Sequence, residues 1–135
     1  MGAWGAGSFD NDTACDWSYG LEEVNDLSLV VKTLSQVLDT QDEYLDADLG
    51  SEALGACEVI ARLKGHWGPR NPYTETVDKW VEAHPIVVSP DHLQSAVAAI
   101  ERILRPPSEL LDLWQEGDGA EWRKAVEELR SRVQA

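Results

Sequence analysis

The chain has 135 residues, of which 43% are hydrophobic, so it is long enough to bury a core and too apolar for a disordered protein. Its formal net charge is −14, which repels nucleic acid and anionic membranes and attracts basic partners. No apolar run approaches the roughly 20 residues of a membrane span, and the first residues lack the basic and apolar regions of a signal peptide. We therefore expect a single cytoplasmic domain spanning residues 1–135.

The opening residues 1–9 are rich in glycine and contain two large aromatic side chains. Because glycine permits tight backbone bends, we expect a packed N-terminal arm in which Trp4 and Phe9 turn inward. Asp10 is a good N-cap residue. The short helix that it starts is expected to end near Tyr19.

Residues 21–38 and 49–63 then show the apolar spacing of helical faces. The acidic stretch between them, residues 39–48, is expected to be a connector or the first turn of the second helix, which Gly65 ends. The positions predicted to be buried are Leu21, Val24, Leu27, Val31, Leu34 and Leu38 in the first segment and Leu49, Ala53, Ala56, Cys57, Ile60 and Leu63 in the second.

Proline and glycine divide the second half of the chain. Residues 65–72 form the clearest loop, and the apolar run 86–88 could be a very short strand. Further helices are expected to begin after the caps Asn71, Ser89, Ser108 and Asp118. The sequence therefore predicts an all-α fold, a single bundle of about five to seven helices with short connections.

Several strings of this sequence are specific enough to indicate a family. They are WGAGSFDND followed by CDW near the start, ALGACEVIARLKG in the middle, and SELLDLWQEG with EWRKAVEELRSRV near the end. In this order and spacing the chain resembles the bacterial domain-of-unknown-function family numbered 4259 over essentially its whole length. The resemblance implies a small cytosolic helical protein of bacteria and implies no activity.

The acidic residues are concentrated in the first part of the chain. Residues 1–56 hold twelve acids and one base, whereas the remaining 79 residues hold thirteen acids and ten bases. Such a balance steers basic partners. The leading hypothesis is a non-enzymatic protein-binding module, of the type of an immunity protein or antitoxin that inhibits a basic partner such as a nuclease. The residues expected to bind this partner are Asp39, Asp42, Glu43, Asp46, Asp48 and Glu52.

The rival hypothesis is a metal-assisted hydrolase or transferase. Asp12 and Asp16 are four residues apart and would share a helix face, with Asp10 one turn before them. Three carboxylates placed in this way could bind Mg²⁺ or Ca²⁺. The spacing is not that of an EF-hand, because Ala14 stands where the third ligand should fall. The simpler interpretation is a helix cap with two surface acids.

Other residues that could support chemistry have no suitable pattern. The histidines have no zinc-like spacing, no glycine-rich phosphate loop is present, and neither cysteine has a base beside it. We therefore expect no cofactor and no catalytic residue. A structural subunit that forms homodimers through an apolar helix face is a third possibility, and the sequence leaves open both the oligomeric state and whether Cys15 and Cys57 pair.

Overall fold

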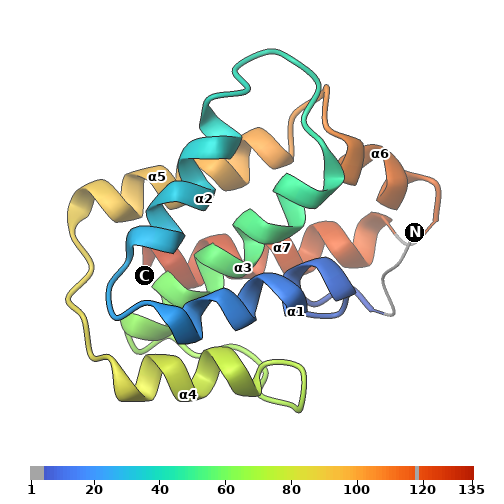
Figure 1. Ribbon diagram of the computed structural model, residues 1–135. Helices are drawn as coiled ribbons and strands as arrows, with labels where there is room; N and C mark the ends of the chain where they lie inside the picture. The colour runs from blue at the N-terminus through green and yellow to red at the C-terminus, as the bar shows by residue number, and fades with distance from the viewer. Residues whose placement is uncertain (1–4, 118) are drawn as a thin grey trace.

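The computed structural model describes residues 5–117 and 119–135, and these form an all-α bundle, as predicted (Figure 1). The described residues contain seven α-helices, one 3-10 helix and no strand; a single isolated bridge joins Leu45 and Ser108. The helices are α1 (Asp12–Tyr19), α2 (Ser28–Leu38), α3 (Ala47–Leu63), α4 (Glu75–Ala83), α5 (Pro90–Ile103), α6 (Glu109–Gln115) and α7 (Gly119–Gln134), and the 3-10 helix is η1 (Gly20–Glu23).

Helix α3 crosses the middle of the molecule and contacts each of the other six α-helices (Figure 1). Small residues allow this central position because they let neighbouring helices approach its axis. Gly55 shows the constraint most clearly: a Cβ atom there would lie 3.2 Å from the ring of Phe9 and 3.3 Å from that of Trp17. Phe9 is 2% exposed and therefore packs inward as predicted. Trp4 lies outside the described residues.

The predicted continuous helical face over residues 21–38 is wrong. The chain forms η1, becomes extended at Val24, and begins α2 only at Ser28. The carboxylate of Asp26 accepts the backbone N–H of Ser28 at 3.0 Å, and such a local turn competes with a helix. The new start shifts the buried face of α2, so Val30 is buried and the predicted Val31 is 40% exposed.

The predicted cap of α1 is also wrong by one residue. The N-cap is Asn11, whose side chain accepts the N–H of Ala14 at 2.8 Å. Asp10 instead accepts the N–H of Gly7 at 3.0 Å and so closes a turn in the segment before the helix. Both residue types can cap a helix, and the position of the first turn decides between them.

Several boundaries in the second half agree with the sequence. Ser89 caps α5 together with His92, and Ser108 caps α6. The loop 65–72 is confirmed, but α4 begins at Glu75, because Asn71 accepts the N–H groups of Tyr73 and Thr74 in a turn that precedes the helix. Residues 86–88 form no strand. The predicted cap Asp118 lies outside the described residues.

One guanidinium joins the two connections that lead into α3 and α6. Arg102 of α5 donates to the backbone carbonyls of Gln41 and Glu43 on one side and to those of Arg105 and Pro107 on the other.

Within the described part of the chain, no helix is both long enough and apolar enough to cross a membrane.

Candidate functional site

Six acidic side chains lie near the N-terminal ends of α1, α3 and α6, which hydrogen bonds link to one another. This surface, called the acidic end below, consists of Asp12, Asp46, Asp48, Glu52, Glu109 and Asp112. Its local structure suits acids, since carboxylates are stabilised at helix N-termini.

Hydrogen bonds position three of these carboxylates. Asp46 is the N-cap of α3 and accepts the N–H of Asp48 at 2.7 Å. Glu109 accepts the N–H of Ala47 at 2.9 Å, so the first residue of α6 lies across the start of α3. Asp48 accepts the hydroxyl of Thr13 at 3.2 Å, which ties α1 to the same place.

Two side chains of this region have raised pKa values, for which desolvation is the first cause and neighbouring negative charge the second. Burial, and then repulsion from Asp48 and Asp46, raise the pKa of the Glu52 carboxyl above its ordinary value. Desolvation, and then the nearby charges of Glu109 and Asp112, raise the pKa of Tyr44, whose side chain is 57% exposed. Both shifts have the direction expected where like charges face one another.

None of the six carboxylates forms an ion pair with a cation of the described chain.

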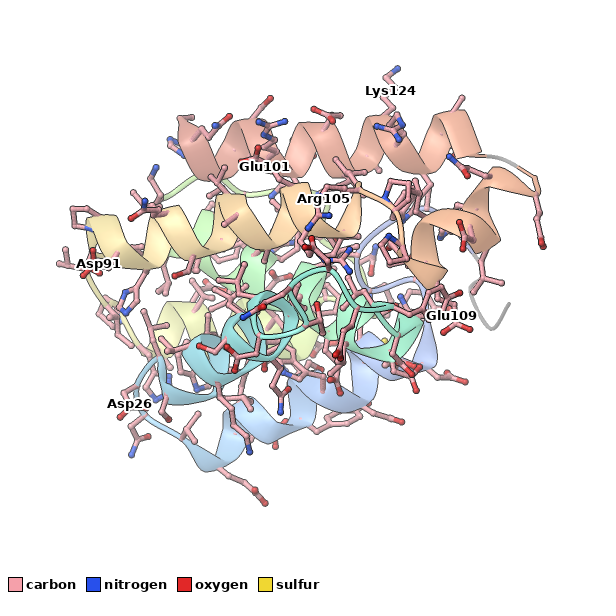
Figure 2. All side chains as sticks on the ribbon, turned by 90° about the horizontal axis from the view of Figure 1, so that it is seen from above. Asp26, Asp91, Glu101, Arg105, Glu109 and Lys124 are labelled. Atoms are coloured by element: carbon pink, nitrogen blue, oxygen red, sulfur yellow. The ribbon has the colours of Figure 1, made fainter. Side chains whose placement is uncertain are left out.

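The residues predicted to bind a partner fall into two groups in the structure. Three of them, Asp46, Asp48 and Glu52, belong to the acidic end. Asp39, Asp42 and Glu43 lie on the exposed connector after α2, where Asp42 pairs with Arg105 at 3.2 Å. Figure 2 shows Arg105 above this connector and Glu109 at the acidic end.

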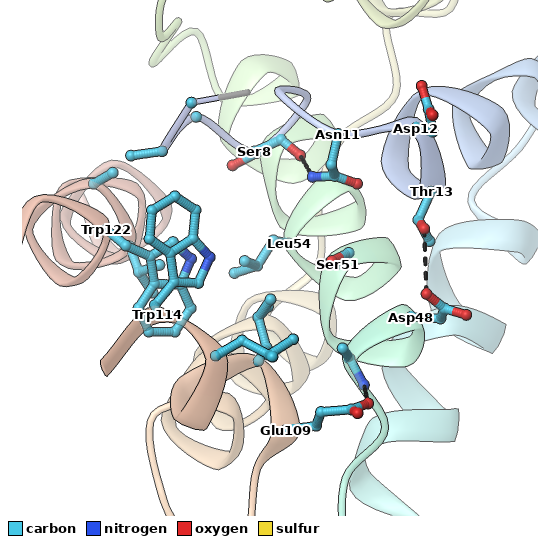
Figure 3. A pocket seen from close by; sticks show the side chains of 18 residues that line it. Ser8, Asn11, Asp12, Thr13, Asp48, Ser51, Leu54, Glu109, Trp114 and Trp122 are labelled. Carbon is cyan, nitrogen blue, oxygen red and sulfur yellow. Dashed lines mark hydrogen bonds between the residues drawn. The ribbon is translucent and has the colours of Figure 1, made fainter. Parts of the chain in front are cut away.

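A pocket of about 460 Å³ opens between the acidic end and α7. Asp12, Asp48 and Glu109 line one side of it, and Trp114 and Trp122 line the other (Figure 3). The two indole rings are stacked, with centroids 6.1 Å apart and planes at 8°. The volume is within the range of pockets that bind small molecules.

Three hydrogen-bonding groups inside this pocket have no partner among residues 5–117 and 119–135. They are the hydroxyl of Ser51 and the indole N–H groups of Trp114 and Trp122, although these residues are only 8%, 8% and 3% exposed. In Figure 3 the nitrogen atoms of both indoles lie on the edge that faces Leu54. These groups are therefore available to a molecule in the pocket.

Two other buried indoles are used internally. Trp17 donates its N–H to the hydroxyl of Thr33 at 2.8 Å, and Trp80 donates to the carbonyl of Val24 at 3.0 Å. Buried tryptophans ordinarily find such a partner. Among the buried tryptophans, only Trp114 and Trp122 have an indole N–H without a partner in the described chain.

The predicted metal site does not form in the described residues. Asp10 bonds to Gly7, Asp12 lines the pocket, and Asp16 is exposed on α1. No group of three His, Cys, Asp or Glu side chains in the described chain is placed to hold a metal ion. Cys15 and Cys57 are both free thiols, and burial raises the pKa of the Cys57 thiol strongly.

A second charged region lies inside the bundle. The buried charge network, as we call it, consists of Glu58 and Arg62 of α3, Asp78 of α4 and Arg132 of α7. Arg62 pairs with Glu58 and also donates to Asp78 at 2.8 Å, while Arg132 donates to Glu58 at 2.8 Å. Two cations and two anions make the network neutral, and it links three helices.

Additional bonds complete the buried charge network. Arg62 also donates to the carbonyl of Pro69 at 2.7 Å, and Thr74 donates to Asp78 at 2.7 Å. Burial alone would lower the pKa of the Arg132 guanidinium, but hydrogen bonds to Glu58 and Glu128 raise it above its ordinary value. The network therefore has the geometry of a structural element whose charges satisfy one another.

The sequence did not indicate the buried charge network, nor the residues of α6 and α7 at the acidic end and in the pocket. Glu58 and Arg62 have the i,i+4 spacing of an exposed helical ion pair, and only the fact that apolar residues surround them on α3 could have indicated burial. Glu109 and Asp112 belong to α6, outside the stretch of residues 39–52 whose acids the sequence predicts to bind a partner. No sequence pattern marks Trp114 and Trp122 as residues of a pocket.

Comparisons with known proteins give one match. A family model described as Domain of unknown function (DUF4259) matches residues 2–125, which span α1 to α6 and the first part of α7. No curated protein and no solved structure matches the chain. The matched range includes the acidic end and both tryptophans of the pocket.

Proposed function

Because the chain belongs to the DUF4259 family, whose description gives no activity, we propose its function from the geometry of the site. The protein is a non-enzymatic binding module of the cytoplasm whose acidic end docks a basic protein. Its role is that of an immunity protein or antitoxin that inhibits a basic partner such as a nuclease. The observation that carries the proposal is the absence of a cation partner for all six carboxylates within the described chain.

Unpaired like charges on one surface produce a field that a basic partner would feel before contact. Charge complementarity of this kind speeds association and sets partner choice more than it sets affinity. At about 0.15 M salt the field extends only about 8 Å from the surface. Association is therefore expected to slow steeply as salt is added, while dissociation changes less.

The acids contribute unequally to this surface. Asp48 and Asp112 are exposed and have no ion-pair partner among the described residues, so they are the best candidates for direct contact. Asp42 already forms an ion pair with Arg105, so its negative charge is partly neutralised and attracts a basic partner less. The rival hypothesis of a metal-assisted hydrolase or transferase has no converging set of three carboxylates to support it in the described chain.

The test compares two variants that each remove two charges. Asp48→Asn with Asp112→Asn alters the acidic end, whereas Glu22→Gln with Glu23→Gln alters two exposed acids of η1. Proteins of the host would be captured on the parent chain at low salt. The association rate of each captured basic protein would then be measured by stopped flow against all three chains, at several salt concentrations.

Slower association with the acidic-end variant alone is the expected result. Equal slowing with both variants would mean that only net charge matters, and would contradict a defined docking surface. Unchanged rates with both variants would show that these carboxylates only keep the protein in solution. Thermal unfolding of each variant provides the control that the fold is retained.

A further inference from the structure

We propose that the pocket between the acidic end and α7 binds a small cationic compound that also carries a hydrogen-bond acceptor. The ligand class is a basic amino acid, either free or as a side chain with its adjoining peptide carbonyl. The pocket shares Asp12, Asp48 and Glu109 with the acidic end, but a free amino acid can occupy it without any protein partner.

The acceptor is required by the inner side of the pocket. An indole N–H can donate a hydrogen bond and cannot accept one. The N–H groups of Trp114 and Trp122 face the pocket, and the hydroxyl of Ser51 lines it, all without a partner among the described residues. A purely apolar ligand would displace water from these three groups and leave them unsatisfied, which is unfavourable. A carbonyl or carboxylate oxygen would satisfy them.

The cation is required by the opposite side. Asp48 and Glu109 each use one oxygen in a bond within the chain, to Thr13 and to the N–H of Ala47. Their second oxygens and the carboxylate of Asp12 have no partner in the described residues. An anionic ligand would be repelled here, whereas an ammonium or guanidinium group would form charge-assisted hydrogen bonds.

The rest of the lining suits the stem of such a ligand. Leu54, Leu110 and Val126 also line the pocket and contribute apolar surface to it. The aliphatic part of an arginine or lysine side chain packs readily on surface of this kind.

The experiment follows the indole N–H signals of the whole protein by ¹H–¹⁵N NMR. Trp114→Phe and Trp122→Phe assign the two pocket signals, and the internally bonded Trp17 and Trp80 serve as references. The probes are L-arginine, L-citrulline, whose side chain is neutral, agmatine, which lacks the carboxylate, and the capped peptide acetyl-Gly-Arg-Gly-amide. Each is titrated to about 10 mM, which detects even weak binding.

We expect saturable shifts of the Trp114 and Trp122 signals with L-arginine, with the capped peptide, or with both, while the Trp17 and Trp80 signals stay in place. Binding of arginine alone would identify a free amino acid as the source, and binding of the peptide alone would identify a protein segment. Asp48→Asn with Glu109→Gln keeps the internal acceptors and should weaken binding about tenfold or more. The pair Glu22→Gln and Glu23→Gln should leave it unchanged.

Three results would overturn the proposal. Equal shifts with citrulline would remove the need for a cationic side chain, and equal shifts with agmatine would remove the need for an acceptor. Unmoved Trp114 and Trp122 signals with all four probes would show that the pocket binds no ligand of this class. If a captured basic protein nevertheless shifts the backbone amides of residues 46–52, docking at the acidic end stands and only the pocket proposal fails.

Discussion

The acidic end and the buried charge network both include residues of α3, but charges are paired in the network and unpaired at the acidic end. In the network, Glu58 and Asp78 meet Arg62 and Arg132, and every charge has an opposite partner. Among the described residues, no carboxylate of the acidic end has a cation partner, and three hydrogen-bonding groups of the adjoining pocket have no partner. The contrast separates residues that hold the helices together from residues that are available to another molecule.

The same contrast governs what a substitution should do. Removing one member of a neutral buried network leaves another charge buried and unpaired, which is costly. Removing the charge of an unpaired carboxylate from a crowded surface, while keeping its hydrogen-bond acceptor, relieves repulsion and costs little. Stability measurements can therefore test the division between the two regions without knowledge of any ligand.

The largest expected effect comes from Arg62→Met in the buried charge network. The methionine fills much of the space but leaves Glu58 and Asp78 without their central cation. We expect a loss of about 3–5 kcal/mol in the free energy of unfolding, measured by urea denaturation. Arg70→Met is the matched control, because Arg70 also reaches Asp78 but is half exposed, and it should cost less than about 1 kcal/mol. Equal losses for the two variants would mean that burial does not distinguish the pairs.

A smaller effect is expected from Thr33→Val in the bundle interior. Valine keeps the shape of threonine but cannot accept the indole N–H of Trp17, which is then buried without a partner. The free energy of unfolding should fall by about 1–3 kcal/mol, and the Trp17 indole signal should move in the NMR spectrum. A loss close to zero would show that water replaces the hydroxyl.

Ser51→Ala is the corresponding change in the pocket and should be nearly neutral. The hydroxyl of Ser51 makes no hydrogen bond within the described chain, so its removal breaks none. Alanine is also the better helix former, by about 0.5 kcal/mol. Thermal unfolding should therefore show an unchanged or slightly raised stability. A clear loss would reveal a structural role for the hydroxyl and would weaken the distinction between the two regions.

The smallest expected effect concerns Glu52 and depends on pH. Its raised pKa means that the folded chain binds this proton more tightly than the unfolded chain does. Stability should therefore decline as the pH rises from the ordinary glutamate value through the raised one, and the loss persists at neutral pH. Glu52→Gln removes this decline, with a gain well below about 1 kcal/mol at pH 7 because solvent screens the charge. Urea denaturation of the parent and the variant at several mildly acidic pH values would show this difference. Free energies of unfolding that change in parallel with pH would contradict the prediction.

The fold could be predicted because its signals are local. Helical periodicity and the caps at Ser89 and Ser108 are read from neighbouring residues, and the structure confirms them. The failures are local as well but depend on competing bonds: the Asp26–Ser28 turn divides the predicted helix over residues 21–38 and changes which valine of α2 is buried.

The candidate site was only partly accessible to sequence reasoning. The excess of acids in residues 39–52 is visible as a count, and Asp46, Asp48 and Glu52 indeed lie together. Glu109 joins them only because α6 folds back across the start of α3, which depends on contacts between residues more than sixty positions apart. No count of charges or periodicity could show that the indoles of Trp114 and Trp122 would remain unbonded.

Arg102 ties together the two connections that precede α3 and α6, and we expect these connections to open to solvent together. Its guanidinium holds the backbone on both sides of the Leu45–Ser108 bridge, where Leu45 donates to Pro107 and Glu109 donates back to Leu45. Segments tied in this way open together and not one at a time. The amides of Leu45 and Glu109 should thus exchange their hydrogens for deuterium in one shared event, and the start of α3 should never part from the start of α6 while the rest of the bundle stays folded.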